Sequence, residues 1–180
     1  KNSKKHKISE GPSQDYCPTF DSNGKYLAFI SNRTFKPMYD SIQFDLNFPK
    51  SEKIYLIILN KNDDSPFIKN PNLDIDKSKK KKDKKTKKDI KTKIDFSNIN
   101  NRTIELPINE TILSNSLGFI NNKIFYLEWS LDVLNDSNNN QKSGTLKYYD
   151  LNTREEKVYL NNVQHFTLSN NKIILHLNNK

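Results

Sequence analysis

The sequence predicts an all-β chain. Short apolar runs rich in β-branched and aromatic residues recur along its 180 residues, and no window shows a sustained helical period. One pattern occurs three times: an apolar run, an Asn-Gly or Asn-Asn turn, a lysine (Lys25, Lys123 or Lys172) and a second apolar run. Lys123 and Lys172 are 49 residues apart, within the range of propeller blade lengths. Repeated four-stranded antiparallel units are typical of β-propellers, so we predict a partial β-propeller of about two to three blades.

The expected strands fill two blades and begin a third. They are residues 17–20, 25–31, 53–59 and 102–108 in the first blade, 113–120, 123–129, 145–150 and 156–160 in the second, and 165–168 and 172–177 in the third. The 98 residues from Lys25 to Lys123 are enough for two blades. However, only two further strand candidates, residues 53–59 and 102–108, lie between the first hairpin and the second unit. We therefore expect one enlarged blade. A self-contained β-sandwich of about eight to ten strands is the alternative fold.

The net positive charge of the chain comes from one segment. Residues 77–93 hold eleven lysines and two aspartates, which matches the net charge of +9 of the whole chain. Blocks of like charge with few apolar residues stay unfolded, so we interpret residues 74–93 as a disordered lysine-rich insertion inside the first blade. A tether to an anionic membrane or to RNA is the alternative. Residues 1–14 are expected to be a polar tail or linker, and residues 15–180 the propeller segment.

The connection between the second and third expected strands is unusual. Residues 34–49 contain six aromatic or branched aliphatic side chains, more than a plain loop needs, so we expect this connection to pack against another part of the molecule. Its polar residues and their neighbour Arg33 are candidates for a surface role, although a structural role in fixing the connection is the preferred interpretation. The candidates are Arg33, Tyr39, Asp40, Gln43 and Asp45.

Several strings of the sequence resemble the tricorn protease family. They begin with Pro18-Thr19-Phe20-Asp21 and Gly24-Lys25-Tyr26-Leu27 and continue through SNRTFKPMYDSIQFDLNFP at residues 31–49. The resemblance resumes after the lysine-rich segment at Ile94-Asp95-Phe96, and again at Tyr149-Asp150-Leu151. It covers most of the chain from residue 15 onward, and the Gln-Phe-Asp-Leu string at residues 43–46 is its most specific part.

The resemblance implies that the chain is the later part of the second, larger propeller of a tricorn-like serine peptidase. In that family two propellers precede a PDZ-like module and a peptidase domain, and the full-length protein is a homo-oligomer that degrades peptides in the cytoplasm. This chain would then act as a scaffold and a substrate-access element. The alternative is a β-propeller that binds other proteins and has no peptidase activity.

The sequence offers no catalytic, cofactor or metal site that we can assign. A serine peptidase needs a nucleophile with a base in reach, but His6 lies in the tail, and His165 and His176 are interpreted as ordinary strand positions. Asp63-Asp64 and the pair Asp74 and Asp76 lack the ligand count of a calcium loop. The lone Cys17 cannot form an intrachain disulfide and fits a reducing, cytoplasmic location. We expect no specific nucleic acid and no membrane as partners, and interpret Trp129 and nearby aromatics as blade packing.

Overall fold

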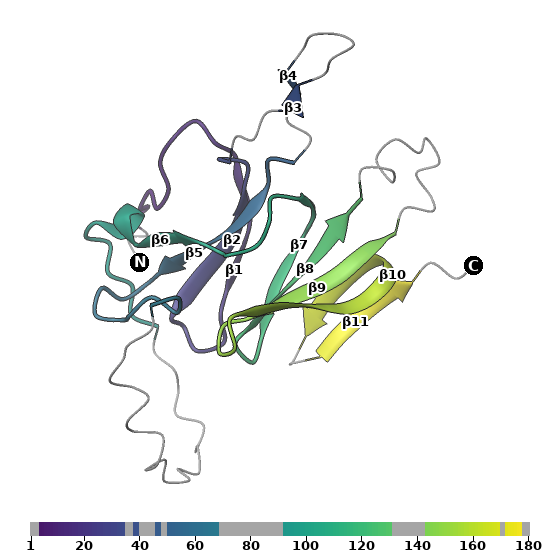
Figure 1. Ribbon diagram of the computed structural model, residues 1–180. Helices are drawn as coiled ribbons and strands as arrows, with labels where there is room; N and C mark the ends of the chain where they lie inside the picture. The colour runs from purple at the N-terminus through teal and green to yellow at the C-terminus, as the bar shows by residue number, and fades with distance from the viewer. Residues whose placement is uncertain are drawn as a thin grey trace, which may run out of the picture.

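The computed structural model describes residues 4–34, 38–39, 46–47, 50–68, 92–130, 143–169 and 172–177 (Figure 1). The described residues form two large antiparallel sheets and a short hairpin, so the predicted all-β class is confirmed. The first sheet has the order β1-β2-β5-β6, and the second the order β11-β10-β9-β8-β7. Figure 1 shows the hairpin of β3 and β4 projecting away from both sheets.

The strands follow the predicted units closely. Those of the first sheet are β1 (Asp15–Phe20), β2 (Tyr26–Ser31), β5 (Lys53–Ile58) and β6 (Thr103–Glu105). Those of the second are β7 (Ile112–Ile120), β8 (Lys123–Trp129), β9 (Gly144–Asp150), β10 (Glu155–Ser169) and β11 (Lys172–Leu177). The hairpin is β3 (Met38–Tyr39) with β4 (Leu46–Asn47), and a 3-10 helix, η3 (Ile99–Arg102), precedes β6.

The prediction of a strand from residue 102 to 108 was wrong in its extent. β6 has three residues, and Arg102 ends η3 instead of opening a strand. The reason is local: Asn98, before η3, is left-handed with φ 51°, and the Arg102 side chain reaches back to main-chain oxygens. Its Nε donates to Ile58 O at 2.9 Å and its Nη1 to Ser97 O at 2.7 Å, which satisfies carbonyls where the chain turns.

The third unit is joined to the second more tightly than expected. The runs 156–160 and 165–168 belong to one 15-residue strand, β10, whose pairing with β9 shifts between Leu160 and Val163, where Asn162 takes a positive φ of 61°. The pairing still changes at Val163. Residues before it pair with β9 and residues after it pair with β11, so the third unit is a two-stranded extension of the second sheet.

Both faces of the first sheet are covered, which explains the continuous apolar sequence of β2 and β5. Side chains of a strand alternate between its two faces. Ala28 and Ile30 therefore point to one cluster, and Leu27 and Phe29 to another. In the second cluster, Ile8 of the segment expected to be a tail packs on the sheet. The N-terminal segment thus lies partly against the fold.

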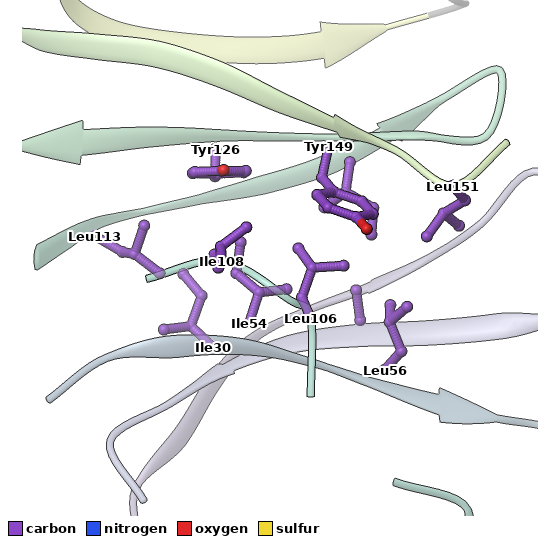
Figure 2. Close-up of a cluster of buried hydrophobic side chains, with 11 residues drawn as sticks. Ile30, Ile54, Leu56, Leu106, Ile108, Leu113, Tyr126, Tyr149 and Leu151 are labelled. Carbon is purple, nitrogen blue, oxygen red and sulfur yellow. The ribbon is translucent and has the colours of Figure 1, made fainter. Parts of the chain in front are cut away.

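The central core lies between the two sheets. Ile30, Ile54 and Leu56 from the first sheet face Tyr126 and Tyr149 from the second, and Figure 2 shows these side chains pointing toward one another. All five are at most 2% exposed. Neighbouring blades of a propeller pack against each other through apolar sheet faces in this way.

The predicted turns are confirmed where the structure describes them. Asn121 and Asn122 have φ of 48° and 63°, the two positive values of a tight hairpin turn, and Gly24 has φ 67°. The buried Asp21 supports the first turn, since its Oδ1 accepts from the N–H groups of Lys25 and Tyr26 at 2.6 and 2.8 Å.

Two of the expectations concern residues that the structure does not describe. The lysine-rich insertion and most of the 34–49 connection lie outside the described residues. No helix in the part of the chain that the structure describes has the length and hydrophobicity to cross a bilayer.

Candidate functional site: a cavity between the inner strands

The first strands of the three units lie side by side. β1 lies beside β7, as Figure 1 shows for the middle of the molecule, and β7 also contacts β10, where Gly118 lies against Leu168. Together they line a cavity of about 470 Å³. Polar side chains such as Thr19, Ser116 and Thr167 alternate there with apolar ones such as Phe119 and Leu168.

Each of these inner strands has an irregular register. The pairing shifts between Tyr16 and Thr19 in β1, between Leu113 and Leu117 in β7, and between Val163 and His165 in β10. A β-bulge bends its strand and frees backbone groups from the ladder. In addition, β1 and β7 are the edge strands of their sheets. The cavity therefore borders main-chain groups as well as side chains.

A glycine allows the close approach of the inner strands. A Cβ atom at Gly118 of β7 would lie 2.2 Å from Leu168 Cδ1 of β10. A side chain at this position would have to displace the Leu168 side chain, so Gly118 makes room for Leu168 at the cavity wall.

A second cavity, lined mainly by polar residues, adjoins the first. It has a volume of about 500 Å³, and Cys17 and Asn115 line both cavities. Glu52 lies at its wall: its Oε2 accepts from the Leu113 N–H at 2.5 Å, and its Oε1 accepts from the Tyr16 hydroxyl. One carboxylate thus joins β1, β7 and the start of β5.

Two ionisable side chains at the cavity walls, Tyr16 and Cys17, are shifted toward their neutral forms. Burial, and then the charge of Glu52, raise the pKa of the Cys17 thiol, so the thiol stays protonated and is a poor nucleophile. Burial and the hydrogen bond to Glu52 also raise the pKa of Tyr16. Among the described residues no group of three or more His, Cys, Asp or Glu is placed to hold a metal ion.

Arg33 lies fixed on the first sheet. Its guanidinium donates to both carboxylate oxygens of Asp15 at 2.8 Å and its Nε donates to Ser31 Oγ at 2.9 Å. It also lies 5.3 Å from the ring centre of Phe29 and 4.8 Å from that of Tyr55. The guanidinium therefore holds the chain at the start of the 34–49 connection.

Of the other predicted surface residues, the structure describes the backbone of Tyr39. Tyr39 belongs to β3, whose partner is β4. Asp40, Gln43 and Asp45 lie outside the described residues. The residues that join the sheets, Glu52 and Arg154, were missed, because their partners lie 61 and more than 80 residues away in the sequence.

The architecture defines the class of protein: antiparallel units packed face to face, with their first strands around a common cavity, are consecutive blades of a β-propeller. The whole chain, residues 1–180, matches the family described as the tricorn protease second beta propeller domain. The chain belongs to this family, and the prediction of a partial β-propeller with a resemblance to tricorn proteases is confirmed.

Individual proteins agree with this assignment. The chain is 33% identical over 158 residues to the tricorn protease homolog of Saccharolobus solfataricus, covering 88% of this chain and 13% of that protein. It is 48% identical over 54 residues, 30% of the chain and 5% of that protein, to tricorn protease homolog 1 of Streptomyces coelicolor. The crystal structure of the tricorn protease superposes with a TM-score of 0.70 over 95% of this chain and 16% of that chain, at 18% identity. The chain therefore spans less than one fifth of these proteins.

Proposed function

We propose that this chain is a non-catalytic part of the second propeller of a tricorn-like serine peptidase, where it acts as a scaffold and a substrate-access element in peptide degradation. The observation that carries the proposal is the cavity of about 470 Å³ between three inner strands of a chain of this family. The peptidase domain and the remaining blades would be supplied by other parts of the same polypeptide, in a homo-oligomer.

The lining suits an extended peptide passing through. Main-chain groups at the bulged edge strands can pair with peptide main chain, while Phe119 and Leu168 offer apolar contact of low selectivity. The single thiol, Cys17, supports a reducing compartment, so we place the protein in the cytoplasm.

The proposal is tested by narrowing the cavity in the full-length protein. Asn115 is exposed and lines both cavities, so Asn115→Trp adds bulk there without disturbing the core. We expect kcat/KM for long peptides to fall at least about tenfold while that for short peptides changes less, since a narrower route hinders long chains most. The matched control is Thr153→Trp, on an exposed turn between β9 and β10.

The alternative function is a propeller that binds proteins and has no peptidase activity. The full-length reading frame distinguishes it from the proposed function. A PDZ-like module and a domain with the peptidase serine and histidine beyond residue 180 support the proposal. A stop codon soon after that residue contradicts it, as does equal hydrolysis of long peptides by Asn115→Trp and the unmodified protein.

A further inference from the structure

Glu52 carries the one charge at the walls of the two cavities, among the residues that the structure describes there. The described residues around the cavity of about 470 Å³ are all uncharged. Those around the cavity of about 500 Å³ are Glu52 and five uncharged residues. A cavity lined by one sign of charge favours ligands of the opposite sign, so the second cavity favours a cation.

The carboxylate of Glu52 has no cation beside it in the part of the chain that the structure describes. Its oxygens accept from the Leu113 N–H and the Tyr16 hydroxyl, and the ammonium group of the adjacent Lys53 pairs with two other glutamates. A carboxylate has about four acceptor sites, and these two bonds occupy two of them. A negative charge and further acceptor sites therefore remain for a ligand.

Both walls of this cavity belong to the chain itself. Tyr16, Asn32 and Glu52 come from the first blade and Asn115 from the second, and the two blades pack on each other through the central core. Blades beyond the chain would pack on the outer sheet faces and not between these two blades. The cavity therefore keeps both walls in a longer protein.

The groups around Glu52 suit a cationic donor. The charge of Glu52 contributes, after the larger effect of burial, to the raised pKa of the Cys17 thiol. A negative charge that disfavours a thiolate favours a cation at the same place. Three residues with amide side chains also line the cavity, and their oxygens are hydrogen-bond acceptors: Gln14, Asn32 and Asn115.

We propose that Glu52 and the three amide residues beside it form a binding site for a primary ammonium group of a peptide. An ammonium group has three N–H donors and a positive charge, which match a carboxylate with amide oxygens around it. The inference rests on the proposed function, because this cavity shares Cys17 and Asn115 with the cavity through which a peptide would pass. The N-terminus of a peptide and a lysine side chain carry the same group.

The test is calorimetric binding of three probe peptides to the full-length protein. All have the same short uncharged sequence and an amidated C-terminus. The first has a free N-terminus, the second is N-acetylated and contains one lysine, and the third is N-acetylated and uncharged. Treatment with a serine-directed fluorophosphonate beforehand keeps the probes intact. We expect the first probe, the second or both to bind at least about threefold more tightly than the third, with a difference that shrinks as salt is added. The probe that gains affinity identifies the source of the ammonium group.

Glu52→Gln separates the charge from the structure. The glutamine oxygen can accept from the Leu113 N–H, and its NH₂ group can donate to the Tyr16 hydroxyl, which accepts as well as donates. The joint between the blades is then kept without the charge, so the preference for ammonium probes should be lost. Tyr16→Phe removes a hydrogen bond of the joint and keeps the charge, so it should retain the preference. Glu155→Gln, which removes an exposed charge between β9 and β10, is the matched control and should bind all probes as the unmodified protein does.

The proposal is overturned if the three probes bind the unmodified protein equally or not at all, or if Glu52→Gln keeps the preference. Circular dichroism checks that each variant is folded. Because binding is measured without hydrolysis, this inference and the proposed function fail separately. A protein without peptidase activity can still prefer the ammonium probes, and a peptidase that is slowed by Asn115→Trp can bind all three probes alike.

Discussion

The carboxylate of Glu52 accepts a hydrogen bond from the main-chain N–H of Leu113, 2.5 Å away, although the two residues lie 61 positions apart. Its other oxygen accepts from the Tyr16 hydroxyl, and its main-chain oxygen accepts from the Thr111 N–H at 3.2 Å. Glu52 therefore joins the inner strand of the first blade to that of the second. This joint lies at the wall of the polar cavity.

Replacing Glu52 by alanine should destabilise the fold. The change leaves the Leu113 N–H and the Tyr16 hydroxyl without their acceptor, and an unsatisfied buried polar group costs about 1–3 kcal/mol. The free energy of unfolding, measured by urea denaturation, should fall by about that amount. Glu155→Ala is the matched control, because Glu155 pairs with Lys157 at the exposed surface, where an ion pair contributes less than about 1 kcal/mol. Equal losses in the two variants would contradict the assigned role.

Arg154 ties a turn of the second sheet to a loop of the first. It lies between β9 and β10, and its guanidinium donates to Pro66 O at 2.9 Å and to Ile68 O at 3.0 Å. Arg154→Ala removes both bonds but keeps a side chain at this positive-φ position, so the backbone strain is unchanged. Amide exchange at Asp63 and Ile68, which donate within this loop, should become faster. Arg154→Lys, which keeps the charge without the fork of donors, should restore little protection.

Asp15 should give the fold a pH-dependent stability. Burial raises the pKa of its carboxyl, but hydrogen bonds from Ser31, Arg33 and Ser9 outweigh burial and hold the pKa below its ordinary value of 3.8. The lowered pKa in the folded state means that the contribution is complete above that value and is lost as pH falls through the folded pKa. Asp15→Asn should therefore lower stability by less than about 1 kcal/mol at neutral pH. The difference between variant and unmodified chain should vanish below the folded pKa, as urea denaturation across the acid range will show.

Ser114 should tolerate removal of its hydroxyl. It is 8% exposed in β7, and its Oγ has no hydrogen-bond partner within the described part of the chain. Burying an unpaired hydroxyl is unfavourable, so Ser114→Ala should be neutral or stabilise the fold by about 1 kcal/mol. Thr111 provides the contrast, since it is also buried but its hydroxyl donates to Glu128. Thr111→Val should lower the free energy of unfolding. If Ser114→Ala lowered it by the same amount, the Ser114 hydroxyl would have a hydrogen-bond partner.

Strand order and turns could be predicted from the sequence because they depend on local signals. An Asn-Asn turn before Lys123 fixes the pairing of Ile120 with Lys123, and the same pattern leads to the pairing of Ser169 with Lys172. That second register places His165 opposite His176. The pairing of the two histidines was therefore within reach of the sequence, although each had been interpreted as an ordinary strand position.

Contacts between blades could not be predicted in the same way. Glu52 and Arg154 stand in polar connections, where charged residues are common, and nothing local distinguishes them from other charged residues. The same holds for Arg102, which donates to carbonyls around η3 instead of lying in a strand. The continuous β10 was missed because Asn161 and Asn162 resemble a loop, whereas they form an irregularity within the strand, at which Asn162 takes a positive φ that asparagine tolerates.

The outer face of the third unit should cause the isolated chain to associate. Ile174 is 57% exposed and lies on the face of β11 opposite the packed Ile173 and Leu175, whereas both faces of β2 and β5 are covered. Sheet faces of a propeller are normally covered by neighbouring blades, and an exposed apolar face promotes self-association. Ile174→Lys should shift the chain toward monomer in sedimentation velocity at equal concentration. Ile68 is 67% exposed but lies in a loop, so Ile68→Lys should have little effect on association. A larger shift toward monomer for Ile68→Lys than for Ile174→Lys would place the associating surface elsewhere.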